Sequence, residues 1–396
     1  MDHDRRKQIF DAVLAEKEQI VSDRRYLHQH PEIGFDTGNT EKMVRDVLSE
    51  SCIEVIPSTV GVMGIIKSGK SDDILALRAD MDALPLQEEN DVPYKSQYDN
   101  RMHACGHDGH TAMLLGAARI LQQYRELLPV NVLLIFQPAE EGPDLGGARI
   151  MLKDLEESGM KSKIRKILGI HLFNDFQTGT AGYRYGAMMA STDEFDIKIT
   201  GKGGHAAQPH EAVDALSLGC KFVDEMESFM SRRIDPLKPA VFSVGSFNAG
   251  TAKNIISENA VISGTVRCLY EDTRASILEA ASKILESICG AYGAEYKLDI
   301  LNGLPVLVND RSTAAFAKNV IGIALGGENA FEITEPIMGS EDFAYFAQKI
   351  PAAFIWLGSG NEEKGFTTLA HNPRFDFDED ALINGVRIFC MAALEA

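Results

Sequence analysis

The 396-residue chain has little positive charge. Its 39 lysines and arginines stand against 58 aspartates and glutamates, which leaves a formal net charge of −19. A surplus of this sign repels phosphate backbones and anionic lipid headgroups. We therefore expect neither nucleic acid nor a membrane surface as a partner.

Long hydrophobic runs and a cysteine framework are also absent. No apolar run is long enough to span a bilayer, and the first 21 residues, MDHDRRKQIFDAVLAEKEQIV, are charged and amphipathic, unlike a signal peptide. The six cysteines are scattered without framework spacing, which favours reduced thiols over disulfides. These features together predict a cytoplasmic protein.

Buried strands are predicted to alternate with helices in much of the chain. Short apolar runs at 62–66, 74–77, 132–136 and 167–170 are separated by stretches with helical periodicity. This order is typical of an α/β sheet with helices on both faces.

The pattern changes after about residue 188. Phe195, Ile197 and Ile199 alternate with polar residues, which predicts a half-buried strand. The order β-α-β-β-α-β then predicts a small sheet with two helices on one face and edges that could pair with a second copy. We expect an inserted domain at 188–302 within a discontinuous domain formed by 1–187 and 303–396, the predicted elements of the insertion being a helix at 213–230, strands at 240–247 and 261–269, a helix at 273–288 and a strand at 296–300.

The segment 64–71, GIIKSGKS, formally matches the nucleotide-binding P-loop pattern. A P-loop must follow a strand and open a helix, whose N-terminus holds the phosphates. Here the next apolar run, at 74–78, reads as another strand. We therefore interpret 68–73 as a hairpin turn and reject nucleotide binding.

The densest cluster of chemically capable residues is 102–110, MHACGHDGH. Gly106 and Gly109 allow the tight backbone that would let a thiolate and imidazoles converge. Cysteine and histidine together suit zinc and its neighbours rather than magnesium or calcium. The alternative is a solvated, histidine-rich helix start.

Further candidates follow predicted strands, where ligands collect in open α/β sheets. Glu140 and Glu141 follow the run 132–136, and two adjacent carboxylates there could divide metal binding and general-base work. His171 follows the run 167–170, and Asp80 and Asp82 follow 74–78. Alone, each of these would be an ordinary charged loop or surface residue.

Taken together, these motifs resemble the M20 family of metallopeptidases and amidohydrolases, and within it the branch of N-acyl-amino-acid, hippurate and auxin-conjugate hydrolases. The resemblance implies a zinc-peptidase-like α/β catalytic domain with an inserted ferredoxin-like α+β lid and dimerisation domain. It covers nearly the whole chain in order, through the motifs RYLHQHPE (25–32), RADMDALP (78–85), CGHDGH (105–110), QPAEEG (137–142), GIH (169–171), GKGGHA (201–206), GSEDF (339–343) and HNP (371–373).

The resemblance also implies roles for single residues. Glu140 becomes the general base and acid, and Asp82 orients a ligand histidine. Two divalent ions per subunit, of zinc, manganese, cobalt or nickel, are implied, with Cys105 as the bridge where most relatives carry aspartate. The implied metal ligands are Cys105, His107, Glu141, His171 and His371.

In the inserted segment, His205, Asn254 and Arg267 match lid positions that reach the substrate. Arg267 and Asn254 would hold an α-carboxylate, and His205 would stabilise the oxyanion from the partner subunit of a homodimer. The expected reaction is hydrolysis of N-acyl-L-amino acids to a carboxylic acid and an amino acid. Two alternatives remain open: a di- or tripeptidase on the same scaffold, and a non-catalytic binding protein.

Overall fold

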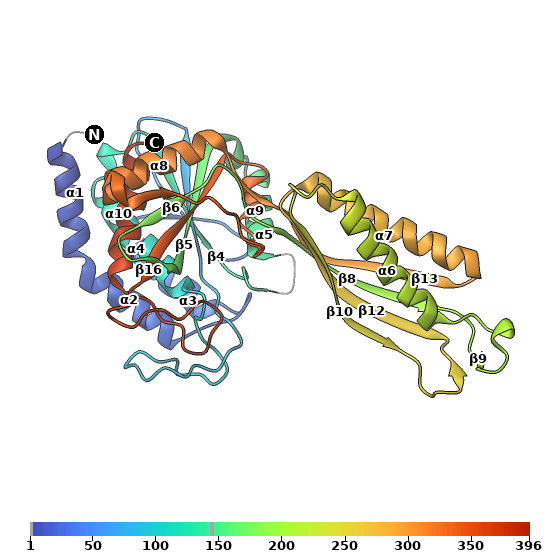
Figure 1. The fold of residues 1–396 in the computed structure, drawn as a ribbon. Coiled ribbons are helices and arrows are strands. Elements are labelled where there is room, and N and C mark those ends of the chain that lie inside the picture. The colour runs from blue at the N-terminus through green and yellow to red at the C-terminus, as the bar shows by residue number, and fades with distance from the viewer. Residues whose placement is uncertain (1–2, 143–145) are drawn as a thin grey trace. The chain divides into compact units, whose positions relative to one another are not determined.

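The computed structural model describes residues 3–142 and 146–396 (Figure 1). The chain divides into two compact units. Unit 1 comprises Met1–Gly186, Val308–Glu335 and Asp342–Ala396, and unit 2 comprises Ala187–Leu307 and Pro336–Glu341. The segment Pro336–Glu341 thus joins the inserted unit, although the sequence pattern placed it in the larger domain.

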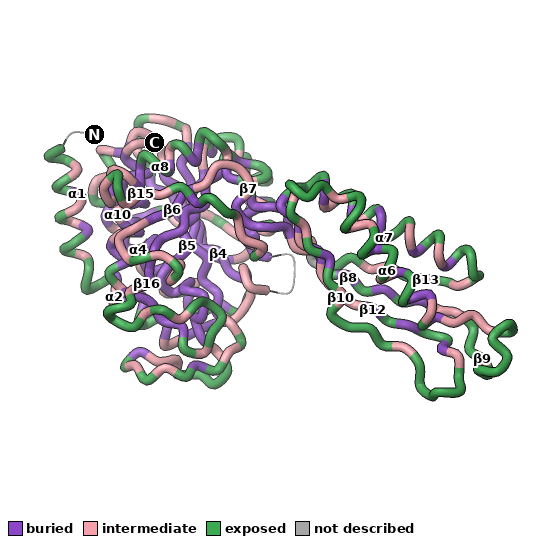
Figure 2. The backbone as a smooth tube through the Cα atoms, in the orientation of Figure 1, coloured by how far each residue is buried: buried purple, intermediate pink, exposed green. Residues whose placement is uncertain are grey.

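Unit 1 is built on an eight-stranded sheet in the order β1-β2-β4-β3-β5-β16-β6-β15. Its central strands β4, β3, β5 and β16 pair in parallel, and β2 and β6 join them in antiparallel fashion. Strands β3, β4 and β16 are almost wholly buried, as is the stretch 167–172 of β5 (Figure 2). The strand bounds are β1 Glu54–Ile56, β2 Val62–Ile66, β3 Ile74–Asp80, β4 Asn131–Gln137, β5 Ile164–Gln177, β6 Ala181–Tyr183, β15 Ala330–Glu332 and β16 Ala352–Gly360.

Helices cover both faces of this sheet. On one face α4 contacts β3 and β5, and α10 packs against α4 and β16; on the other, α5 contacts α9 and β4. The alternation along β5 fits this arrangement, because Leu168 and Ile170 join the core with α4 whereas Gly169 faces Phe343 at the start of α9. The expected α/β class is confirmed. The helices of unit 1 are α1 His3–Ala15, α2 Lys17–Gln29, α3 Gly38–Glu50, α4 His107–Gln123, α5 Gly146–Glu157, α8 Arg311–Leu325, α9 Ala344–Ala347 and α10 Asp380–Leu394.

The structure supports the rejection of the P-loop, because β2 is followed by the strand β3 with no helix between them. The expected hairpin at 68–73 is wrong. β4 lies between β2 and β3 in the sheet and pairs with both. The connection is therefore a crossover over a neighbouring strand, which local turn signals do not distinguish from a hairpin.

Unit 2 contains a four-stranded antiparallel sheet in the order β10-β12-β8-β13. Phe195, Ile197 and Ile199 of β8 face a core shared with α6 and α7, while the alternate residues of this strand face away from it. The bounds are β8 Ser191–Thr200, α6 Ala215–Arg233, β10 Ala240–Ala249, β12 Asn259–Cys268, α7 Glu271–Tyr292 and β13 Glu295–Leu304, with the short strands β9 Gly204–His205 and β11 Ile255–Ile256 paired separately. The short strands β7 Gly186–Met189 and β14 Leu307–Asn309 lie where the chain passes between the units.

Among the described residues, no helix has both the length and the apolarity needed to cross a bilayer.

Candidate metal centre

The cluster found in the sequence lies where the chain enters α4. Gly106 adopts a left-handed conformation, with φ of 84°, and His107 is the first residue of the helix. This turn brings the ligand atoms of Cys105, His107 and His171 within 4.8 Å of one another. Cys105 Sγ lies 3.4 Å from His171 Nε2, and all three side chains are buried.

A second group shares the same cysteine. Ligand atoms of Cys105, Glu141 and His371 also lie within 4.8 Å of one another, and His371 Nε2 is 2.9 Å from Glu141 Oε1. His371 has a positive φ of 63°, and its backbone N–H donates to the carbonyl of Ala104 at 2.7 Å. The structure therefore brings the five candidate ligands into two groups that meet at Cys105.

Asp82 holds the loop that carries the two glutamates. Its Oδ1 accepts the backbone N–H of Glu140 and its Oδ2 that of Glu141, both at 3.0 Å. The same Oδ1 lies 3.5 Å from His107 Nδ1. Asp82 therefore both fixes the Glu140–Glu141 turn and faces the ring nitrogen of His107 that points away from Glu140, whose Oε2 lies 4.0 Å from Nε2.

The electrostatics of this centre favour a bound cation. Burial alone would lower the pKa of His107, but the charges of Asp80 and Asp82 outweigh it and raise this pKa to about 10. Burial, together with Glu141 and Glu140, raises the pKa of the Cys105 thiol well above its usual value. Within the described residues neither ring nitrogen of His107 makes a hydrogen bond. The buried donors Cys105, His107 and His171, with the half-buried Glu141, the exposed His371 and surplus negative charge, fit a divalent ion of the zinc type.

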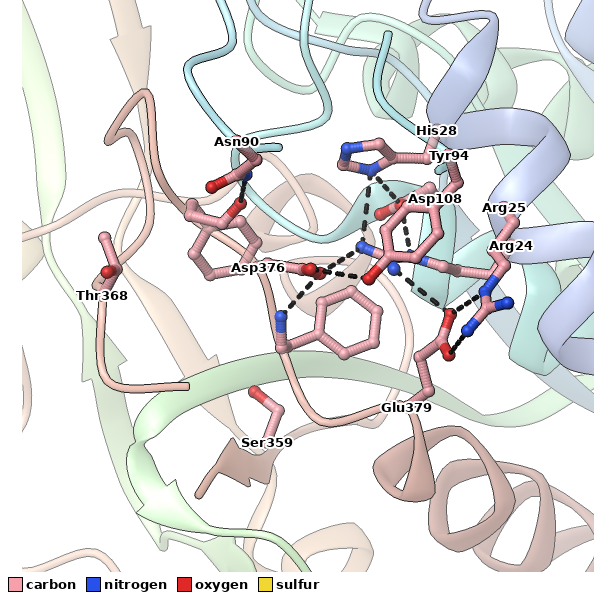
Figure 3. Close-up of polar contacts among 12 residues, drawn as sticks. Arg24, Arg25, His28, Asn90, Tyr94, Asp108, Ser359, Thr368, Asp376 and Glu379 are labelled. Carbon is pink, nitrogen blue, oxygen red and sulfur yellow. Dashed lines mark hydrogen bonds and ion pairs between the residues drawn. The ribbon is translucent and has the colours of Figure 1, made fainter. Parts of the chain in front are cut away.

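A buried ion-pair network supports this region from outside (Figure 3). Arg24 of α2 donates from Nε to Asp108 and from Nη2 to Asp376, each at 2.8 Å. His28 lies between Asp108, at 2.7 Å from Nδ1, and Glu88, at 3.2 Å from Nε2. The network joins α2, the first turn of α4 beside His107, and the loop that follows His371.

Two groups of unit 1 near the centre were not assigned roles from the sequence. Asp80 and His110 form a 2.5 Å contact beside His107. The spacing of His107 and His110, three residues apart at a helix start, was the available signal, since it places both on one side of the helix. That His110 meets Asp80 depends on the register between α4 and β3, which spacing alone does not reveal.

The predicted lid residues lie in unit 2 and form two separate sites. His205 is exposed in β9 next to β11, and the N–H of Ala206 donates to the carbonyl of Asn254 at 3.1 Å. Arg267 lies near the opposite end of β12, eight residues after Asn259. At a rise of ~3.3 Å per residue, this separation is about 26 Å along the strand. Its Nη1 bonds to Met338 O and Ser340 Oγ, both at 3.3 Å. Within one chain, Arg267 and Asn254 therefore lie at opposite ends of this sheet, and the expectation that they hold one carboxylate stays a prediction.

Comparison with known proteins identifies the class. The model of peptidase family M20/M25/M40 matches residues 76–395. Thermostable carboxypeptidase 2 of Saccharolobus solfataricus is 37% identical, with 95% of each chain covered, and hippurate hydrolase of Campylobacter jejuni is 38% identical, with 94% of this chain and 95% of that one covered. The crystal structure of the Bacillus subtilis YXEP protein, described as a dinuclear metal binding peptidase of the M20 family, superposes with a TM-score of 0.82 at 33% identity, over 96% of this chain and 98% of that one.

The chain therefore belongs to peptidase family M20/M25/M40, as the sequence motifs predicted. It is a metal-dependent amidohydrolase of this family.

Proposed function

We propose that this protein hydrolyses the amide bond of N-acyl-L-amino acids and releases a carboxylic acid and a free amino acid. The observation that carries the proposal is the convergence of five candidate ligands on Cys105, beside a glutamate pair fixed by Asp82. A relative at 38% identity is named for the hydrolysis of hippurate, an N-acyl-amino acid, which supports this substrate class.

Two divalent ions would be held by Cys105, His107, Glu141, His171 and His371, with Cys105 common to both. Zinc, manganese, cobalt and nickel all suit this mixed donor set. When bound, such ions lower the pKa of a water and polarise the amide carbonyl.

Glu140 is the proposed base. Its backbone is held by Asp82, and its carboxylate faces His107 across 4.0 Å without belonging to the five-ligand set. It would accept the proton of the attacking water and then deliver it to the leaving amine, so that one carboxylate serves first as base and then as acid.

His205, Asn254 and Arg267 would recognise the carbonyl oxygen and the α-carboxylate. Because His205 and Asn254 lie at one end of the unit 2 sheet and Arg267 at the other, a single chain cannot place them around one small substrate. A homodimer would resolve this, with His205 and Asn254 supplied by the partner and Arg267 by the chain's own lid.

Strand β10 offers the edge for such a dimer. Its ten residues, AVFSVGSFNA, contain no charge, whereas the opposite edge β13 carries Glu295, Lys297 and Asp299. Charged side chains on an edge strand oppose pairing with a second copy, and an uncharged edge permits it. We therefore assign β10 as the pairing edge.

A di- or tripeptidase is the second candidate, favoured by the carboxypeptidase name of a relative at 37% identity. A peptidase that acts on free dipeptides must recognise a substrate ammonium group, which an acylated amino acid lacks. The test is a hydrolysis screen of acetyl-, benzoyl- and indoleacetyl-amino acids against free di- and tripeptides, each with zinc, manganese, cobalt and nickel. Turnover of acylated substrates alone supports the proposal; turnover of free peptides alone, or none with any metal, overturns it.

A further inference from the structure

His110 is a buried histidine of α4, 1% exposed, that lies beside the candidate ligands. Its ring centroid is 4.6 Å from that of His171 and 5.4 Å from that of His107. Ligand atoms of Asp80, His107 and His110 even lie within 4.8 Å of one another, which raises the question of whether His110 binds metal as well.

The hydrogen bonds of His110 answer that question. The backbone N–H of Leu172 can only donate, and it lies 2.9 Å from His110 Nε2, so Nε2 must accept. The ring proton is then on Nδ1 and is donated to Asp80 Oδ1 at 2.5 Å. Asp80 is held in turn, since its Oδ2 accepts from Arg78 Nη1 at 2.6 Å. Both ring nitrogens of His110 are therefore in use, and no lone pair is left for an ion.

Leu172, which His110 holds, directly orients the ligand His171. His171 Nδ1 donates to the carbonyl of Leu172 at 2.8 Å, which leaves the lone pair of Nε2 directed toward Cys105. Helix α4 holds the Leu172 side chain too. A Cβ added at Gly109 would lie 2.6 Å from Leu172 Cδ1 and 2.7 Å from Phe377 Cζ, so the close packing of these two side chains on the helix requires glycine here. One turn of α4 thus fixes both the backbone and the side chain of Leu172, which in turn determines the orientation of the His171 ring.

We propose that His110 is a positioning residue, which holds the metal ligand His171 in its binding orientation by accepting the N–H of Leu172, with Asp80 and Arg78 fixing its tautomer. The inference rests on the proposed function, because it requires His171 to be a ligand. Partners beyond the ligands typically contribute about 10–100-fold to metal affinity.

Two substitutions separate the two bonds of His110. His110→Asn places an amide nitrogen near the position of Nδ1, which can still donate to Asp80 but leaves Leu172 N–H without its acceptor. His110→Gln extends an amide oxygen to the position of Nε2 and restores that acceptor. Thr111→Val is the matched control, since Thr111 Oγ1 donates to the carbonyl of Asp80 at 2.8 Å and its loss removes a neighbouring buried bond without touching Leu172.

The measurements are the stoichiometry and affinity of Zn²⁺ and Co²⁺ by chelator competition, with folding checked by circular dichroism. Trp356, the only tryptophan, adds a spectroscopic readout, because its ring is 4.6 Å from Phe173, whose ring is 4.7 Å from His171. We expect His110→Asn to weaken the binding of one of the two ions by about 10–100-fold and to change the response of Trp356 fluorescence to metal. His110→Gln and Thr111→Val should stay within about three-fold of wild type, below the usual range for such partners.

Unchanged affinity for both ions in His110→Asn would overturn the inference, as would an equal loss in the folded Gln or Thr111→Val variants. If His110→Asn does not fold, His110→Ala removes the same acceptor with a smaller side chain and should weaken the binding of the same ion; unchanged binding in that variant overturns the inference. A wild-type protein that binds no divalent ion would refute the proposed function, whereas two tightly bound ions with an indifferent His110→Asn would refute this inference alone.

Discussion

At the scale of single residues, the two adjacent glutamates have different neighbours, although ligand atoms of both lie within 4.8 Å of His107. Both backbone N–H groups bond to Asp82, but only Glu141 shares a group with Cys105 and His371. Glu140→Gln preserves shape and removes the base, so we expect a fall in kcat of at least ~10²-fold, a usual magnitude for general-base loss, with two ions still bound.

The matched control for this prediction is Glu141→Gln, which should lose metal as well as activity. Steady-state kinetics and elemental analysis on both variants make the test. Loss of an ion from Glu140→Gln, with both ions retained in Glu141→Gln, would reverse the two assignments.

At the scale of elements, Arg24 connects α2 with α4 and the loop before α10. Its side chain has no exposed surface and pairs with Asp108 and Asp376, whose charges, against the cost of burial, hold the pKa of this guanidinium well above its ordinary value. Arg24→Met would leave these carboxylates without their cation, and removing one partner of a buried pair costs about 3–5 kcal/mol.

The adjacent Arg25 provides the control, since its side chain is 46% exposed and pairs with Glu379 at the surface. Arg25→Met should change the free energy of unfolding by no more than ~1 kcal/mol, as is typical of surface pairs. Urea unfolding of unit 1, followed by Trp356 fluorescence, measures both. Equal destabilisation by the two variants would contradict this assignment.

The same network predicts a pH dependence. Both ring nitrogens of His28 face carboxylates, Asp108 and Glu88. Burial and the charge of Arg24 lower the pKa of His28, but bonding to Asp108 and Glu88 prevails and raises it. A group whose pKa is higher in the folded than in the unfolded state stabilises the fold. This stabilisation is fully present at pH values below the unfolded-state pKa of about 6.5, and it is lost as the pH rises through the folded-state pKa.

We therefore expect the stability difference between wild type and His28→Gln to be largest near pH 6 and to shrink on titration into the alkaline range. Thermal unfolding at a series of pH values tests this. A difference that grows with pH would show that His28 is neutral in the folded protein.

How far the sequence predicts these features depends on the distance along the chain between the groups concerned. The α/β class and the candidate ligands were accessible because strand runs are local and because Cys105 and His107 lie two residues apart in one short motif. The insertion of β4 between β2 and β3, the bond from His110 to Leu172 and the separation of Arg267 from Asn254 were not, since each depends on pairings between distant segments.

At the scale of the whole molecule, the uncharged edge β10 predicts how two copies associate. Ser243 is exposed on this strand, and Ser243→Lys places a charge where a second β10 would pair, so we expect a shift from dimer to monomer. Leu301→Lys, also exposed but on the opposite edge β13, should leave the dimer intact. Sedimentation equilibrium distinguishes these outcomes, and the reverse pattern would move the interface to β13.

The proposed dimer makes a stronger prediction about catalysis. If His205 acts on the partner's centre, then His205→Ala and Glu140→Gln are each inactive as homodimers but complement each other when mixed. In the heterodimer, one of the two sites combines an intact Glu140 with an intact His205 from the other chain, while the second site lacks both. Subunits exchanged under mild denaturation should therefore recover up to about half of the wild-type activity per heterodimer, because one site in two is complete.

A second mixture, of His205→Ala with Asn254→Ala, is the control. It should recover no activity if Asn254 also acts across the interface, because each site then takes both residues from one partner chain, and neither chain carries both intact. Heterodimers that form and stay inactive in the first mixture would place His205 in its own chain's site, or outside catalysis.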